Sequence, residues 1–323
     1  LAPYCIVKAI HEGKGAPAEA QTSPFRKNRN TMAEITAALV KALRDKTDAG
    51  MMDCKKALNE CNGDMDAAVK YLREKGIAKA AAKADRDAKE GVIRAAVAPC
   101  GCSGIILELN CETDFCAKGD KFQGLVNDVA NALMDSKAST LEEALQVPMA
   151  EGSTEEYIKA MCSSIGENMA LRKFARLTAD GIGAVVSYIH MGGKVGVLLS
   201  IKAGKEETVK SDAFKALAKD LTLHIAAAAP KSVSSDSLDP AFVAEEQEIA
   251  KQQLIQEGKP EHLLEKILPG KLKALYAQSC LLNQVFVKDP AGKMTVEALL
   301  NQAGKELGDD ISVASFVRYQ LGA

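Results

Sequence analysis

The 323-residue chain has no tryptophan, and only 4% of its residues are aromatic. Proteins that hold single-stranded nucleic acid stack the bases on aromatic side chains, so this scarcity argues against such a platform. The formal net charge is -2, whereas a protein that neutralises phosphate groups needs a basic surface. No run of about 18 apolar residues is present, so the sequence predicts no membrane-spanning helix.

Motifs of common enzyme sites are also missing. The sequence contains no Walker loop, no His-Glu-x-x-His pair and no Gly-x-Ser-x-Gly nucleophile motif. The histidines His11, His190, His224 and His262 are scattered and lack metal-ligand spacing. Gly192-Gly193-Lys194 is a weak phosphate-binding signal, because a hairpin turn alone explains two adjacent glycines.

Nine cysteines are present, an odd number that does not suit a framework of disulfides. Cys100 and Cys102 flank a glycine in a predicted hairpin turn, and a zinc site that joins them with Cys111 and Cys116 is one alternative. The two-residue spacing of a zinc knuckle is missing, so we expect reduced structural thiols and no functional metal. Reduced thiols in turn favour a reducing compartment.

The segment of residues 1–31 differs from the rest of the chain. It is rich in proline, glycine, lysine and arginine, has no helical period, and lacks the apolar core of a signal peptide. We expect a disordered or non-native tail, and a transit remnant or upstream translated sequence are the alternatives. Met32 begins the first segment with a regular pattern.

Apolar residues at helical spacing predict three short helices within residues 32–76, arranged as a domain similar to ubiquitin-associated (UBA-like) modules. Asp53 is predicted to cap the second helix and Asp64 the third, and Gly76 is predicted to end the third. Met51-Met52 is placed in a loop, where flexible thioether side chains suit either an adaptable contact surface or core filling.

A strand–turn–strand–helix pattern then occurs twice and predicts an α+β fold with a duplicated core. Each antiparallel hairpin can bury one face against the helix that follows it. Residues 139–179, between the two units, are predicted to be mostly helical. The remaining assignments are a linker helix at 77–90, core subdomains at 91–183 and 184–323, an inserted helical hairpin at about 239–282, and a last strand at 311–321.

Thr113-Asp114-Phe115 directly follows the strand-like run that ends near Cys111. An acid and a large aromatic ring side by side, where a strand leaves its sheet, suit insertion into a partner. The ring can wedge between elements while the carboxylate competes for a cation or a donor. In the alternative interpretation, Asp114 only caps the following helix and Phe115 only fills the core.

Several motifs, in order from Met32 to about residue 320, resemble the elongation factor Ts family. The resemblance implies a guanine-nucleotide exchange factor for elongation factor Tu, with no enzymatic chemistry and no cofactor. It also implies a bacterial cytoplasmic protein, or one of an organelle matrix or stroma if the tail is a transit remnant. The motifs are Met32-Ala33-Glu34-Ile35-Thr36, Thr47-Asp48-Ala49-Gly50-Met51-Met52-Asp53-Cys54-Lys55-Lys56-Ala57-Leu58, Asn110-Cys111-Glu112-Thr113-Asp114-Phe115, Ile165-Gly166-Glu167-Asn168 and Ser187-Tyr188-Ile189-His190.

The resemblance also implies which residues contact elongation factor Tu. The ring of Phe115 is expected to wedge between helices of the GTPase and to weaken its bound magnesium ion. The predicted helical hairpin resembles a dimerisation insert, so a homodimer or a 2:2 complex is expected. Cys116 departs from the family, in which many members carry valine. The implied contact residues are Lys55, Lys83, Thr113, Asp114, Phe115, Ile165, Gly166, His190 and Val287.

Two other functions are consistent with parts of the sequence. A helical adapter could use the three-helix domain to bind another helix or tail, but this leaves the duplicated core unexplained. A thiol enzyme could use Cys111 or Cys116, but a depressed thiol pKa is required and no histidine lies nearby in the sequence.

Overall fold

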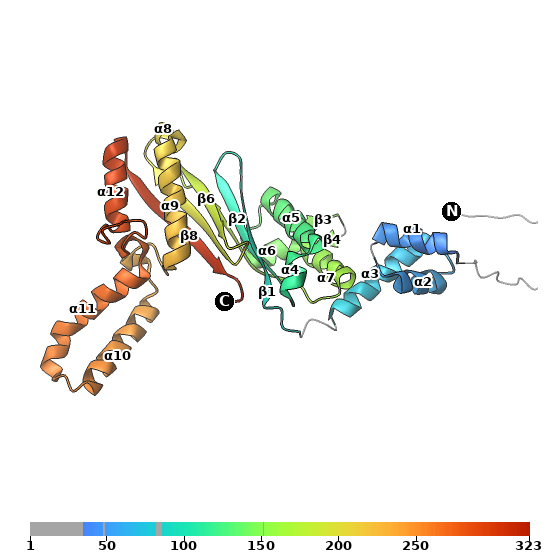
Figure 1. Ribbon diagram of the computed structural model, residues 1–323, viewed down its shortest axis with the longest axis horizontal. Helices are drawn as coiled ribbons and strands as arrows, with labels where there is room; N and C mark the ends of the chain where they lie inside the picture. Colours follow the sequence, from blue (N-terminus) through green and yellow to red (C-terminus); the bar gives the residue numbers. More distant parts are fainter. Residues whose placement is uncertain (1–34, 48, 82–85, 151) are drawn as a thin grey trace, which may run out of the picture.

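The computed structural model describes residues 35–47, 49–81, 86–150 and 152–323. The molecule is elongated, with N-terminal helices at one end, two sheets in the middle and a helical hairpin toward the other end (Figure 1). This mixed architecture confirms the predicted α+β fold class. Within the described residues, no helix combines the length and the apolar character that crossing a membrane requires.

Three helices, α1 (Ala37–Thr47), α2 (Met51–Glu60) and α3 (Met65–Ala81), enclose a small core around the buried Leu43 and Leu58. Asp64 caps α3 as predicted, because its Oδ1 accepts the N–H groups of the second and third helical residues, both at 3.0 Å. Asp53 does not cap α2, which has Gly50 at its N-cap. The two methionines predicted to lie in a loop are instead the first two residues of α2.

Helix α3 continues past Gly76, so this glycine does not end it. Gly76 is buried, and a Cβ there would lie 3.4 Å from Ser163 Cβ on α7 (Thr154–Ile165). Arg73 Nη2 also lies 3.3 Å from Glu156 Oε2. Contact with α7 therefore favours continuation of the helix. The predicted linker helix at 77–90 is wrong in part, since 77–81 belong to α3, 86–89 are not helical, and 82–85 lie outside the described residues.

The first sheet has the antiparallel order β1 (Glu90–Val97), β2 (Ser103–Cys111), β5 (Ala170–Thr178). Strand β5 was not predicted, and residues 139–179 contain this strand besides the helices α6 (Leu141–Gln146) and α7 and the short strands β3 (Pro148–Met149) and β4 (Gly152–Ser153). A register shift opposite Glu108 and Leu109 places Leu171 and Phe174, three positions apart, on the buried side. This irregularity removes the period-2 pattern by which a strand is recognised.

The second sheet has the same construction, with the order β6 (Gly183–His190), β7 (Val195–Ala203), β8 (Ile311–Gln320). In each unit the middle strand leads into a short helix and then a long one, which confirms the predicted duplication. These are α4 (Asp114–Lys118) and α5 (Asp120–Asp135) in the first unit, and α8 (Glu206–Lys210) and α9 (Asp212–Ala228) in the second. The second unit also contains η1 (Ser235–Ser237), α10 (Pro240–Gln256), α11 (Glu261–Ser279), η2 (Leu281–Asn283) and α12 (Val296–Leu307).

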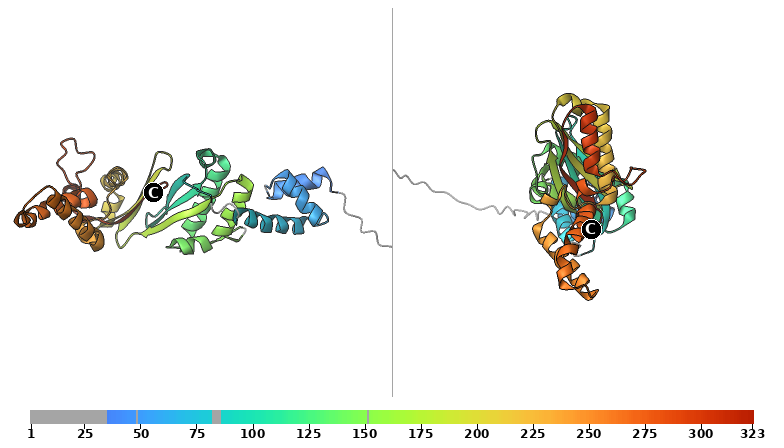
Figure 2. Two further views of the ribbon diagram at one scale, coloured as in Figure 1. Left: turned by 90° about the horizontal axis from the view of Figure 1, so that it is seen from below. Right: turned by 90° about the vertical axis from the view of Figure 1, so that its left-hand side faces the viewer.

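The two sheets pack against each other, and their helices cover the outer faces (Figures 1 and 2). Alternate residues of each middle strand produce these layers. On β2, Leu107 belongs to the core beneath α5, while Ile106 belongs to the core between the sheets. On β7, Leu199 faces α9 and Leu198 faces the first sheet.

Two glycines, one at the start of each middle strand, allow the sheets to approach closely. A Cβ on Gly196 would lie 2.5 Å from Ile93 Cγ2, and a Cβ on Gly104 would lie 2.9 Å from Val185 Cγ1. Neither distance is compatible with ordinary van der Waals contact. The equivalent placement of both glycines shows that the contact between the sheets follows the duplication.

The cysteine expectation is wrong for one pair. Cys100 and Cys102 form a disulfide with an S–S distance of 2.11 Å, in the turn between β1 and β2. Cys111 lies at the opposite end of β2 and is free. The four-cysteine zinc site considered from the sequence is therefore not formed.

We predict that Gly196→Ala lowers the free energy of unfolding by about 1–3 kcal/mol, because the added methyl group must displace Ile93. Gly124→Ala is the matched control, since nothing lies within 4 Å of its Cβ position on α5. The control should be neutral or stabilising by up to about 1 kcal/mol, because glycine disfavours a helix interior. Urea denaturation measures both, and equal effects of the two substitutions would contradict the prediction.

Candidate partner-binding site

Helix α4 presents Phe115 to solvent. Thr113 is its N-cap, and the Thr113 Oγ1 accepts the Cys116 N–H at 3.1 Å. Asp114 pairs with Lys118 at 2.7 Å, and this hydrogen bond to the ammonium group lowers the pKa of the Asp114 carboxyl. The Phe115 side chain is 85% exposed. The alternative interpretation is therefore wrong on both points, since Asp114 is not the cap and Phe115 is not a core residue.

A reciprocal set of hydrogen bonds holds the segment before α4. The Glu167 Oε2 accepts the N–H groups of Glu112 and Thr113, both at 3.0 Å, and its Oε1 accepts the Thr113 hydroxyl at 2.7 Å. In return, Glu112 Oε1 accepts the Asn168 N–H at 2.6 Å. Gly166 ends α7 in a left-handed conformation, with φ of 97°, and so directs the next residue back toward β2. We call this arrangement the carboxylate clamp.

The second unit contains an equivalent clamp. The Asp309 Oδ1 and Oδ2 accept the N–H groups of Gly204 and Lys205 at 3.0 and 2.9 Å, directly before α8. A hydrogen bond from the Thr208 side chain is the main cause that lowers the pKa of Asp309. Glu207 is the second residue of α8, as Phe115 is of α4. The clamp is therefore part of the repeated scaffold, whereas the exposed aromatic ring belongs to the first unit.

The turn after β6 lies against β1, the strand that α4 also contacts. His190 ends β6 with an exposed side chain, and its Nδ1 is 2.8 Å from the Tyr188 Oη. In the same turn, Met191 is 72% exposed. Lys194 pairs with Glu90 of β1 at 2.6 Å, and its charge adds a small contribution, after Lys118 and the Phe115 backbone, to the lowered pKa of Asp114. This ion pair fixes the His190 turn to the first residue of β1.

A buried histidine holds the segment that returns from the helical hairpin. The His224 Nδ1 accepts the Val287 N–H at 3.2 Å, which assigns the ring proton to Nε2, where Gln284 Oε1 accepts it at 2.9 Å. His224 is fully buried, and burial lowers its pKa. Val285 and Val287 are half-exposed, so the network fixes a backbone that presents both side chains outward.

Comparison with known proteins decides the family. A family model described as elongation factor TS matches residues 112–323, which include the clamp, α4 and the His190 turn. A protein named elongation factor Ts from a Nitratiruptor species is 44% identical over 288 residues, covering 89% of this chain and 93% of the relative.

The chain belongs to the elongation factor Ts family.

The structure brings together only part of the contact set that the elongation factor Ts resemblance implies. The clamp joins α4 to the end of α7, and the Lys194 ion pair attaches the His190 turn to β1, the strand that α4 contacts. Lys55 is exposed on α2, which lies among the N-terminal helices at one end of the molecule (Figure 1), whereas Val287 is bonded to His224 of α9 in the second unit. Lys83 lies outside the described residues. The residues united around α4 are Thr113, Asp114, Phe115, the half-buried Ile165, the exposed Gly166 and His190.

Sequence reasoning missed several residues that shape this site. Glu167 was noted only as part of a motif, and its partners lie 54 and 55 positions away in the chain. Met191 and Val285 were not singled out, although each is a large apolar residue within two positions of a predicted site residue, and this proximity in the sequence was the available signal.

We predict that Glu167→Ala accelerates amide hydrogen exchange at Glu112 and Thr113 by at least about tenfold, because it removes a charged acceptor from both amides. Asp309→Ala is the matched control and should affect Gly204 and Lys205 instead. Mass spectrometry with peptide resolution can measure both. Unchanged protection in Glu167→Ala would show that the clamp does not hold this segment.

We also predict that the neutral His224 stabilises the folded state and that acid removes this stabilisation. Its ordinary pKa of 6.5 is lowered in the folded state. Above that value the imidazole is neutral in both states, so the contribution is fully present. As the pH falls below it, the unfolded state binds a proton that the folded state resists. The unfolding free energy then decreases by at most about 1.4 kcal/mol per pH unit.

Urea denaturation between roughly pH 7.5 and 5.5 tests this prediction. His224→Asn has no titrating group at this position, so its stability should decline less steeply than that of the parent protein. Parallel declines would contradict the assignment of a neutral His224.

Proposed function

We propose that this member of the elongation factor Ts family is a guanine-nucleotide exchange factor for elongation factor Tu. It binds the GDP-bound GTPase, disturbs the magnesium and phosphate site, and promotes GDP release so that GTP can bind. The single observation that carries the proposal is the 85% exposed Phe115 on a helix whose start is fixed by the clamp.

The geometry around Phe115 suits insertion into a partner. A large apolar ring in water gains free energy when it enters a protein interior, by about 25 cal/mol for each Å² of apolar surface that is buried. The Thr113 cap and the Glu167 hydrogen bonds order the backbone before the partner arrives. Thr113 thus has a positioning role, because its hydroxyl is engaged inside the protein.

Preference for the nucleotide-free GTPase is sufficient for this mechanism. A factor that weakens GDP binding must itself be weakened by GDP to the same extent, because the two binding equilibria are linked. Phe115 would supply the disruptive element and Asp114 a competing negative charge. Asp114 already pairs with Lys118, so it must exchange this partner to reach a cation of the GTPase.

Other contacts would make the interface broad. Exposed apolar side chains occur near the start of α2, in the His190 turn and in the returning segment. We propose Lys55, Ile165, Gly166, His190 and Val287 as the remaining described contacts. Dimer formation through α10 and α11 stays a prediction.

The two other functions considered from the sequence have less support. Helix α3 packs on α7 through Gly76 and the Arg73–Glu156 pair, so the N-terminal helices are attached to the core rather than free to act as a separate adapter. A thiol enzyme is disfavoured because burial raises the pKa of Cys111 to about 11, and burial also raises that of Cys116.

We predict that Phe115→Ala slows release of a fluorescent GDP analogue from elongation factor Tu by roughly 30-fold, as for truncation of a central anchor worth about 2 kcal/mol. Its thermal midpoint should not change, because the ring is exposed. Ile182→Ala is the control, since Ile182 is also exposed, at 40%, in the turn between β5 and β6.

Two outcomes of this assay would contradict the proposal. No acceleration of GDP release by the parent protein would reject the exchange function. An early-melting Phe115→Ala variant with normal exchange per folded molecule would show that the ring stabilises the fold instead.

A further inference from the structure

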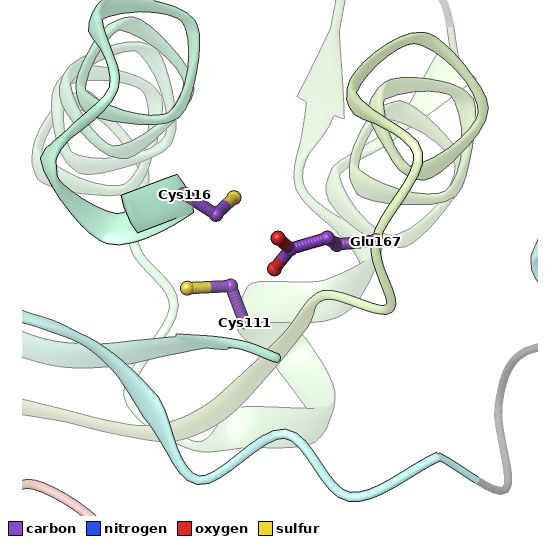
Figure 3. A group of neighbouring side chains, drawn as sticks. All are labelled: Cys111, Cys116 and Glu167. Atoms are coloured by element: carbon purple, nitrogen blue, oxygen red, sulfur yellow. The ribbon is translucent and has the colours of Figure 1, made fainter. Parts of the chain in front are cut away.

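Two thiols and one carboxylate converge beside α4. The sulfur atoms of Cys111 and Cys116 and a carboxylate oxygen of Glu167 all lie within 4.8 Å of one another. They come from the end of β2, from α4 and from the segment between α7 and β5, and the three side chains are neighbours (Figure 3). Cys111 is fully buried, and the other two are half-buried.

The cluster has the composition of a cation site. Two cysteine sulfurs and one carboxylate oxygen, each able to supply one ligand atom, lie together at the start of α4. Glu167 accepts hydrogen bonds from two backbone amides and the Thr113 hydroxyl, and it also bonds to the Cys116 thiol; all of these donors are neutral. A divalent cation bound among these atoms would balance the charge of two thiolates and a carboxylate.

The second unit provides an internal comparison. Its clamp has Asp309 in place of Glu167, and the Thr208 hydroxyl bonds that carboxylate from within α8. Ala203 ends β7 where Cys111 ends β2. The scaffold therefore forms the clamp without any sulfur, and clamp formation alone does not account for the paired thiols of the first unit.

We propose that Cys111, Cys116 and Glu167 bind one Zn²⁺ ion. Thiolate and carboxylate groups are both zinc ligands, at distances of about 2.3 and 2.1 Å. Tetrahedral zinc holds two sulfurs about 3.8 Å apart, so the observed cluster requires at most a modest contraction. Two Zn–S bonds form as both thiols release their protons to solvent. Glu167 supplies one oxygen lone pair and keeps its amide hydrogen bonds, and water completes the coordination.

The ion would tie both ends of the exposed segment to one point. Cys111 precedes Glu112–Phe115 and Cys116 follows it, while Glu167 already holds the amides between them. Bound zinc would therefore restrain the loop that carries Phe115. This inference depends on the side-chain cluster alone, so it stands independently of the proposed exchange function.

Cobalt titration of the full chain, with a phosphine reductant present, tests the proposal. One equivalent of Co²⁺ should give thiolate charge-transfer absorption and the visible bands of tetrahedral coordination. Cys116→Val should weaken binding by more than the roughly 100-fold that loss of an outer-shell partner can cost. The Cys100→Ser/Cys102→Ser double variant is the control and should retain the spectrum, because this pair lies at the other end of β2.

A measurement on the parent protein guards against misfolding of the variant. X-ray absorption at the zinc edge should show two sulfurs at about 2.3 Å, with oxygen ligands nearer to about 2.0 Å. Three results would overturn the proposal. The protein could fail to retain stoichiometric zinc, or the absorption data could show four sulfur ligands. The cobalt spectrum could also be lost only in the Cys100/Cys102 double variant.

Discussion

The hydrogen bonds between the Glu167 carboxylate and the backbone at Glu112 and Thr113 are the interaction on which the candidate site depends. Backbone amides at the end of a strand have no ladder partner once the chain leaves the sheet, and an unpaired buried amide is costly. A carboxylate that accepts two such amides satisfies both and fixes the direction in which the chain continues. In this protein that direction determines where α4 begins and where Phe115 points.

Duplication explains why the same solution occurs twice. Each unit requires its middle strand to turn into a helix that covers one face of the sheet, while the other face packs on the second sheet. Gly104 and Gly196 permit the contact between the sheets. Glu167 and Asp309 bind the backbone directly after each middle strand. Because the carboxylate clamp after each middle strand has the same geometry, substitutions elsewhere in α4 can add a function without a new scaffold.

The sequence was informative where a local pattern reflects burial. The helix that follows each hairpin was predicted, because each of these long helices, α5 and α9, buries one apolar stripe against one sheet. Strand β5 was missed because a bulge interrupts its alternation. The role of Glu167 could not be read locally, since its partners lie more than fifty positions away. The exposure of Phe115 was likewise undecidable, because an aromatic residue at a strand exit is compatible with either a core or a surface position.

The comparison of α4 with α8 separates the part of the site that stabilises the fold from the part that is available for binding. Both helices begin after a clamp and contain an ion pair between their first and fifth residues, Asp114–Lys118 and Glu206–Lys210. At the second position, however, one carries Glu207 and the other Phe115. A charged residue is the ordinary choice for a solvated helix, whereas an exposed ring gains nothing from water. Since both units form the same scaffold with either residue, we propose that a partner buries the ring, and the fixed backbone would reduce the entropy lost on binding.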